Sequence, residues 1–178
     1  DPNDPNRVVI LLMGVGITSI DLMQVVQHSP PVVGARHSFD ILPNGNYVVV
    51  SLNYGMSPNS GAVTWGNGTT GVAGGVSSLN SLLGGRNNDQ AGSGGITVLS
   101  NGNYVVHTPS WDHGNTIADA GAVTWCNGAT GGVVGNISSS NSLVGNSIGD
   151  QIGSGGITAL SDGNFAVRSP NFDNGATT

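Results

Sequence analysis

The sequence predicts an all-β protein made of β-propeller-like blades, each with four antiparallel strands. Two stretches sixty positions apart, residues 61–68 and 121–128, are nearly identical, so one structural unit has been copied along the chain. Asn-Gly or Asp-Gly pairs begin at positions 44, 67, 101, 127 and 162, between runs of β-prone residues, where they favour hairpin turns. The 30 Gly and 8 Pro among 178 residues also interrupt regular helices throughout.

Residues 1–38 form the least regular part of the chain. They begin with a polar, Pro-interrupted lead, and the start at Asp1 rather than Met indicates a processed or excised piece of a longer protein. The apolar run at residues 8–13 fits either a buried strand or a buried helical turn. A shift of 79 positions matches six of fifteen residues with the second repeat, so we expect a degenerate half repeat in this part of the chain.

From residue 39 onwards, one hairpin motif occurs three times. Residues 41–49, 98–106 and 159–167 each carry two β-prone runs around an Asn-Gly or Asp-Gly pair. Such a pair is typical of a type I′ turn, which needs positive φ at both central residues. Each copy is therefore expected to form two antiparallel strands.

The second half of each unit supplies two more strands. A Gly-Ala-Val-Thr-Trp strand runs into a second Asn-Gly turn and a Val-, Ser- and Leu-bearing stretch, and an Asp-Gln-x-Gly-Ser-Gly-Gly link leads to the next hairpin. The link glycines imply positive φ or a close approach of two backbone segments. We therefore divide the repeats into blade 1 (residues 39–95), blade 2 (96–156) and the first hairpin of an incomplete third repeat (157–178).

A parallel β-helix is the main alternative, because three coils of about twenty residues would also fill each unit. The turn signals argue against it, since the intervals between them are 23, 34, 26 and 35 residues rather than one constant period. Tight hairpins also require antiparallel neighbours. With about 2.5–3 blades, against roughly four to eight in known propellers, one chain is not expected to close a ring.

Charge and hydropathy exclude several classes of partner. The chain has a net charge of −6 and only 4 Lys and Arg residues, so neither nucleic acid nor an anionic membrane is expected as a partner. No apolar run reaches the roughly 18 residues that cross a bilayer, so membrane insertion is not expected. The single Cys126 is replaced by Gly66 in the other copy, which indicates a tolerated small residue rather than a required thiol.

No catalytic constellation is present, and we predict that the protein is not an enzyme. The nucleophile elbow Gly-x-Ser-x-Gly, the phosphate-binding Gly-Lys-Ser/Thr and the zinc-binding His-Glu-x-x-His are all absent from the sequence. His107 takes the place of Val50 and Arg168 in the other copies, and His113 takes that of Asn174. Both histidines are therefore expected to be surface or loop residues.

Four aspartates recur in pairs and are weak candidates for metal ligands. Asp89 and Asp150 precede the glycine link, and Asp112 and Asp173 each follow an aromatic residue. Aspartate often caps a turn by accepting hydrogen bonds from backbone N–H groups. This structural role is the preferred interpretation, and no cofactor is expected.

Two pairs of aromatic residues recur in the repeats and are candidates for sugar binding or for packing between blades. Trp111 and Phe172 lie on the loop that follows a hairpin, where exposed rings would form a ligand-binding platform for sugars. Trp65 and Trp125 recur in a strand beside a turn, which fits packing between blades.

The repeats resemble those of known surface proteins over residues 39–178. The motifs Leu-x-Asn-Gly-Asn-Tyr-Val-Val, Ala-Gly-Ala-Val-Thr-Trp and Asn-Ser-Leu-Val-Gly look like repeats of large bacterial filamentous-haemagglutinin-like proteins, and like a variant of the FG-GAP blade of integrin-type propellers. The FG-GAP resemblance implies a calcium loop. The turns here offer only Asn44, Asn101, Asn103 and Asp162, whereas Ca²⁺ takes roughly six to eight oxygen ligands.

These observations lead to one function hypothesis and one alternative. Every repeated feature has a folding role and none has a catalytic role. We therefore expect a structural or adhesive module of a secreted or cell-surface bacterial protein, which associates with itself into an oligomer or fibre. The alternative is a lectin-like propeller that binds host or cell-surface glycans through Trp111 and Phe172.

Overall fold

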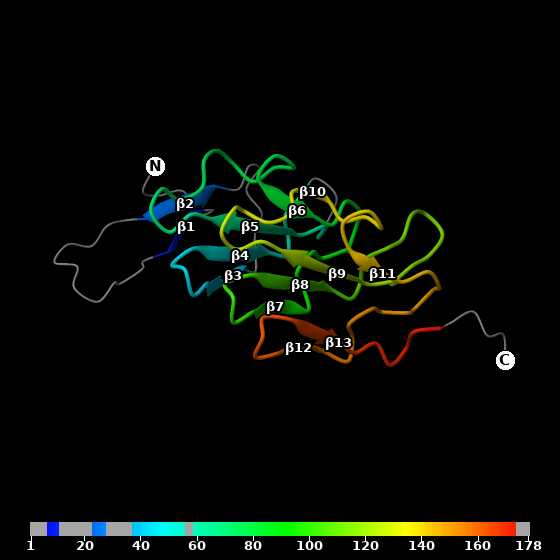
Figure 1. Cartoon of the computed structure of the whole chain (residues 1–178). Coiled ribbons are helices and arrows are strands. Elements are labelled where there is room, and N and C mark those ends of the chain that lie inside the picture. Colours follow the sequence, from blue (N-terminus) through cyan, green and yellow to red (C-terminus); the bar gives the residue numbers. More distant parts are fainter. Residues whose placement is uncertain (1–6, 11–22, 28–36, 56–58, 174–178) are drawn as a thin grey trace.

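The computed structural model describes residues 7–10, 23–27, 37–55 and 59–173, and over these ranges the protein is all-β (Figure 1). Thirteen strands are present there and no helix, so no described segment is a helix that could cross a membrane. The strands, in chain order, are β1 (Arg7–Ile10), β2 (Met23–Gln27), β3 (His37–Ile41), β4 (Tyr47–Ser51), β5 (Ala62–Gly66), β6 (Ser81–Leu83), β7 (Gly95–Val98), β8 (Tyr104–Thr108), β9 (Ala122–Cys126), β10 (Gly135–Asn136), β11 (Leu143–Val144), β12 (Ile157–Ala159) and β13 (Phe165–Val167).

The strands form four small sheets, and three of these follow the repeats. β3, β4, β5 and β6 lie side by side in repeat 1, β7, β8, β9 and β11 do so in repeat 2, and β12 pairs with β13 in repeat 3. Neighbouring strands are antiparallel except for β10, which pairs in parallel with β6. The prediction of open, four-stranded blades is confirmed, and the strands in the described part of the chain do not close a ring.

The N-terminal part is described in two strands. β1 takes up the first residues of the apolar run and pairs antiparallel with β2, with Arg7 opposite Gln27 and Val8 opposite Val26. A strand rather than a helical turn therefore starts this run. The remainder of the predicted half repeat lies outside the described residues.

The hairpin turns differ from the predicted type. Leu42 N–H donates to Asn46 O at 2.8 Å and Gly45 N–H donates to Leu42 O at 2.9 Å, so three residues form the loop. Gly45 has a φ of 83°, but Asn44 does not have positive φ. The turn is therefore type I followed by a left-handed glycine, and the predicted type I′ turn is wrong. Pro43 suits this loop because its fixed φ matches the second position of a type I turn.

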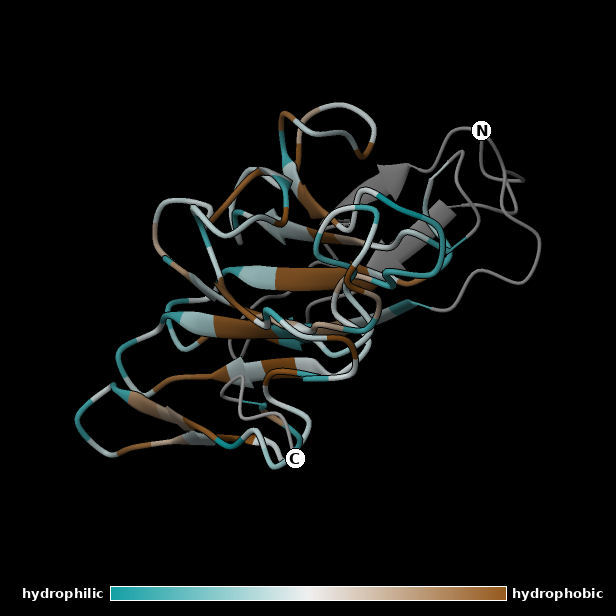
Figure 2. Cartoon of the chain, turned by 90° about the vertical axis from the view of Figure 1, so that its right-hand side faces the viewer, coloured by the Kyte–Doolittle hydropathy of each residue, from teal (hydrophilic) through white to brown (hydrophobic). Residues whose placement is uncertain are grey.

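The first two sheets stack face to face, as the blades of a propeller do. Figure 2 shows the hydrophobic stretches of successive strands one above another. Successive residues of a strand point to opposite faces. Val48 and Val50 of β4 share one hydrophobic cluster with Tyr104 and Val106 of β8, and all four side chains are at most 2 % exposed. This cluster fills the space between the sheets of repeats 1 and 2.

A second cluster joins repeats 2 and 3. Val105, on the other face of β8, belongs to a cluster against which Phe165 and Val167 of β13 pack. Ala166, between these two residues, is exposed. One face of the last hairpin is thus covered by repeat 2, and its other face is bare.

The glycine link approaches the strands closely, as the sequence predicts. A Cβ on Gly92 would lie 2.8 Å from side-chain carbons of Val50 and Val63, and Gly92 has a φ of 82°. In the next repeat, Gly153 lies against His107 in the same way. His107 is only 8 % exposed, so its predicted surface position is wrong, and burial lowers its pKa.

Candidate functional site

A dense polar contact lies where repeat 2 meets repeat 1. The backbone carbonyl of Gly128, in the second turn of repeat 2, accepts hydrogen bonds from three side chains of repeat 1. Trp65 Nε1 and Asn46 Nδ2 donate at 2.9 Å, and Asn44 Nδ2 donates at 3.0 Å. Gly128 itself is buried. This contact, together with the strand pair β10–β6, is called the repeat joint below.

The strand pair extends the sheet of repeat 1 with a segment of repeat 2. Gly135 of β10 lies opposite Leu82 of β6, and Asn136 lies opposite Leu83. Ile137 N–H then donates to Leu83 O at 2.9 Å. An uncovered strand edge presents unpaired N–H and C=O groups. Repeat 2 therefore covers the edge of repeat 1 that would otherwise be open.

Asp89 ties two loops together at the same boundary. Its side chain is fully buried and accepts the backbone N–H groups of Arg86 at 2.8 Å and Asp112 at 3.1 Å. The Asp112 carboxylate in turn accepts the N–H of Asp119 at 2.9 Å. Burial raises the pKa of Asp89 to about 6, although the two hydrogen bonds act to lower it. Asp89 thus connects the end of repeat 1 to the loop after β8.

Asp150 makes the equivalent connection one repeat later. Its carboxylate is fully buried and accepts the N–H groups of Asn146, Ser147 and Asp173, each at 2.9 Å. Burial acts to raise the pKa of Asp150, but the three hydrogen bonds outweigh it and hold the pKa below 3.8. Among the described residues, no group of three or more His, Cys, Asp or Glu side chains could hold a metal ion.

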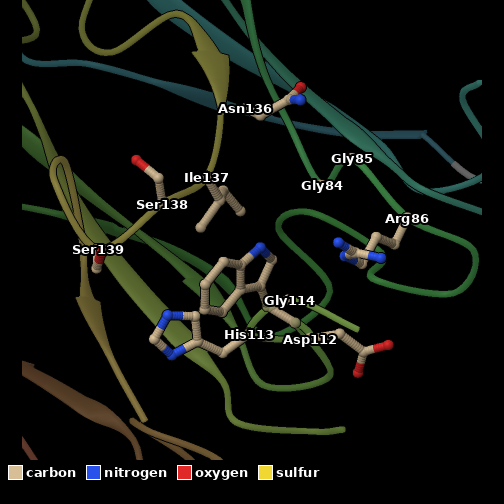
Figure 3. A pocket seen from close by; sticks show the side chains of 11 residues that line it. Gly84, Gly85, Arg86, Asp112, His113, Gly114, Asn136, Ile137, Ser138 and Ser139 are labelled. Carbon is tan, nitrogen blue, oxygen red and sulfur yellow. The ribbon is translucent and has the colours of Figure 1, made fainter. Parts of the chain in front are cut away.

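An open cavity of about 360 Å³ adjoins the repeat joint (Figure 3). Loops of both repeats line it, with His113 and Arg86 on different sides. The His113 ring stacks on Trp111 with 5.3 Å between ring centroids, and its Nδ1 lies 3.0 Å from the carbonyl oxygen of Gly145. The lining residues are Gly84, Gly85, Arg86, Trp111, Asp112, His113, Gly114, Asn136, Ile137, Ser138 and Ser139.

The structure separates the two predicted sugar-binding aromatics. Trp111 is 5 % exposed and packs in the cluster between repeats 1 and 2, so the expectation that its ring is exposed is wrong. Phe172 is 47 % exposed and does not line the cavity. Sequence reasoning placed Trp65 between blades but missed its hydrogen bond to Gly128. The signal that could have found it is the recurrence of a Trp two positions before an Asn-Gly pair.

Comparisons with known proteins identify the repeat. One family model, described as "Repeat of unknown function (DUF5650)", matches three times, at residues 41–93, 98–154 and 159–178, which together make up more than half of the chain. No curated protein and no solved structure matches the chain. The matches support three copies of one unit, and they point neither to filamentous-haemagglutinin-like repeats nor to FG-GAP repeats. The chain belongs to the family of DUF5650 repeats.

Proposed function

We propose that the chain is a non-enzymatic structural module whose activity is association with further copies of itself. The observation that carries the proposal is an exposed hydrophobic face on the third repeat. The equivalent face is buried in the first two repeats. Leu42 and Leu99 hold the same position in the first two hairpins and are 2 % and 1 % exposed, whereas Leu160 in the third is 43 % exposed. Covering such a face removes apolar surface from water, which favours association.

An adhesive role on a bacterial cell surface or in a secreted protein is the biological setting that we propose. The resemblance of the motifs to haemagglutinin-like repeats supports it. Composition supports association as well, because only 8 % of the residues are charged and little repulsion keeps strand edges apart. Partners under this proposal are other copies of the chain and the glycans of a surface.

Light scattering over a dilution series tests the proposal. We expect the mean mass to rise above that of the monomer between micromolar and millimolar protein, because Leu160 is exposed and β11 is the last strand of its sheet, with only β9 beside it among the described strands. Electron microscopy of the same samples would distinguish closed rings from open filaments. A folded monomer at every concentration contradicts the proposal.

Sugar binding is the second candidate, and the cavity beside the repeat joint favours it. Its lining combines the His113 ring, which is stacked on the buried Trp111, with the polar side chains of Arg86, Asp112 and Asn136, and this suits the ring and the hydroxyl groups of a sugar.

A glycan array with two variants tests this alternative. If a glycan binds in the cavity, Arg86→Ala is expected to weaken binding about tenfold or more, because a charged hydrogen-bond donor is lost. Phe172→Ala, which changes a residue outside the cavity, is the matched control and should bind as the wild type does. Loss in Phe172→Ala alone would place the site at that loop instead, and the absence of binding to any glycan would eliminate this candidate.

A further inference from the structure

We propose that two copies of the chain form a twofold dimer through the outer face of the repeat 3 hairpin, the face of β12 and β13 that points away from repeat 2. This inference rests on the self-association proposed above and names the surface and the symmetry that produce it. Figure 1 shows β12 and β13 at one end of the row of sheets, beside β7 of repeat 2 and with no described strand beyond them.

The alternation of side chains along β13 identifies two residues of the outer face. Phe165 and Val167 pack against the cluster of repeat 2, so Ala166 between them points outwards. Arg168 is at the next alternate position, and its N–H donates to Gly156 O at 3.0 Å, so the pairing of the two strands continues there. Both Ala166 and Arg168 are exposed, so nothing in the folded chain covers this part of the face.

The hairpin loop contributes two more residues to the outer face. Leu99, the counterpart of Leu160, lies in the cluster between repeats 2 and 3, which places Leu160 on the face that points away from repeat 2. Asn101, the counterpart of Asp162, donates from Nδ2 to Gly163 O of the next hairpin at 3.2 Å. Asp162 therefore lies on the side where a further unit would be seated, and it is exposed.

The outer face of repeat 3 is not a copy of the faces that repeats 1 and 2 bury. Three of its residues, Asp162, Ala166 and Arg168, take the places of Asn101, Val105 and His107 in repeat 2 and of Asn44, Val48 and Val50 in repeat 1. An ionised carboxylate accepts hydrogen bonds but cannot donate one, so Asp162 cannot hold a backbone carbonyl as Asn101 does. Arg168 puts a charge where both earlier repeats have a residue that is at most 8 % exposed. The face is therefore unsuited to a further repeat of the same kind.

The two charges make the outer face complementary to itself. Asp162 lies in the loop at one end of the hairpin, and Arg168 lies just beyond β13 at the other end. A twofold axis that crosses the strands near Ala166 makes the two β13 strands run in opposite directions, so that Asp162 of each copy meets Arg168 of the other. An axis along the strands would bring like charges together, which disfavours that orientation. Charge complementarity therefore points to a second copy as the occupant of the face, and an isologous contact of this kind closes with two copies.

The side chains between the charges allow a close approach of the two faces. Thr158 of β12 lies opposite Ala166 of β13, and both are short and exposed. Leu160, which is 43 % exposed, would lose contact with water in the dimer, which favours association. The Asn164 backbone N–H and Nδ2 donate to the Asp162 carboxylate at 3.0 and 2.8 Å, and so fix the direction of its charge. A single hairpin face is smaller than the roughly 800 Å² that each partner buries in a stable complex, so we expect a weak dimer.

Asp162→Asn tests the ion pairs with the least change to the fold, because Asn stands at this position in the first two repeats. We expect the dimer to weaken about fivefold in light scattering, since one ion pair is lost at each end of the contact. Asp119→Asn is the matched control, because it neutralises an exposed carboxylate outside the face, and it should associate as the wild type does. Unchanged association in Asp162→Asn overturns the inference. Stronger association also overturns it, because the restored Asn would then be holding a further unit as Asn101 does.

Mixing two charge reversals tests the orientation of the contact. Asp162→Lys and Arg168→Glu each bring like charges together at both ends of the dimer, so neither variant should dimerise alone. An equimolar mixture should restore the dimer, because opposite charges then meet at both ends. Dimerisation of either variant alone as in the wild type, a mixture that stays monomeric, or wild-type assemblies larger than a dimer would overturn the twofold contact while self-association of the wild type stands. A wild type that is monomeric throughout overturns both proposals.

Discussion

Replacing Gly128 with alanine is expected to destabilise the chain strongly. A Cβ at this position would overlap the carbonyl oxygen of Gly102 and lie 2.9 Å from a methyl carbon of Leu42. The shift needed to relieve the overlap would also weaken the three hydrogen bonds that the Gly128 carbonyl accepts. Overpacking and the weakened bonds together should cost about 4 kcal/mol of unfolding free energy, which lowers Tm by roughly 10 °C.

Gly45→Ala is the matched control for this prediction. Gly45 also lies in a turn and has a φ of 83°, but an added Cβ there would meet no atom within 4 Å. Only the left-handed backbone conformation should then cost stability, by about 1 kcal/mol. Thermal unfolding of the two variants followed by circular dichroism measures the difference. If Gly45→Ala lost as much stability as Gly128→Ala or more, the cost at Gly128 could not be assigned to the contacts of the repeat joint, because turn conformation alone would account for it.

The repeats and their antiparallel strands could be predicted because their signals are local. The β-prone runs of each hairpin, the Asn-Gly or Asp-Gly pairs and the glycines of the link each occupy a few consecutive residues. Each of these patterns occurs more than once in the chain, which makes it easier to recognise. The turn type was mispredicted for a related reason. An Asn-Gly pair fits both a two-residue and a three-residue loop, and the choice depends on whether Leu42 pairs with Asn46 across the hairpin.

The repeat joint could not be predicted, because its partners are far apart in the chain. β10 has two residues, and no local pattern marks it as a strand that pairs with β6 rather than with its own sheet. The burial of Trp111 was missed for the same reason. A loop position predicts exposure, but here Ile137 and Ala91 belong to the same buried cluster as the indole, and both come from other loops.

Asp89, Asp112 and Asp150 accept backbone N–H groups, as the turn-capping interpretation expects, but the electrostatics of Asp89 and Asp150 differ between repeats. Asp89 and Asp150 are equivalent in sequence and both are fully buried, yet the pKa of Asp89 is raised to about 6 and that of Asp150 is lowered. Desolvation is the dominant effect at Asp89, which lies between two complete repeats. Asp150 lies beside the incomplete repeat 3, and desolvation also acts to raise its pKa, but its three backbone hydrogen bonds together outweigh that effect.

Opposite pH dependences are therefore expected for Asp89→Asn and Asp150→Asn. The folded pKa of Asp89, about 6, exceeds its ordinary value of 3.8. The folded state therefore holds this proton more tightly, and the stability it contributes is complete below pH 3.8 and lost as the pH rises through 6. Because each pKa unit corresponds to about 1.4 kcal/mol, the unfolding free energy should fall by about 3 kcal/mol over this range. Relative to Asp89→Asn, the wild type should thus become less stable between pH 4 and pH 7.

The contribution of Asp150 to stability should have the opposite pH dependence. Its folded pKa lies below 3.8, so the stability it contributes is present above that pH and is lost as the pH falls through the folded pKa. Relative to Asp150→Asn, the wild type should be unaffected between pH 4 and pH 7 and should lose stability below pH 4. Urea unfolding of the wild type and both variants from pH 3 to pH 7 measures these differences, and each variant serves as the control for the other. Equal pH slopes for the two variants would show that the repeats bury both carboxylates in the same environment.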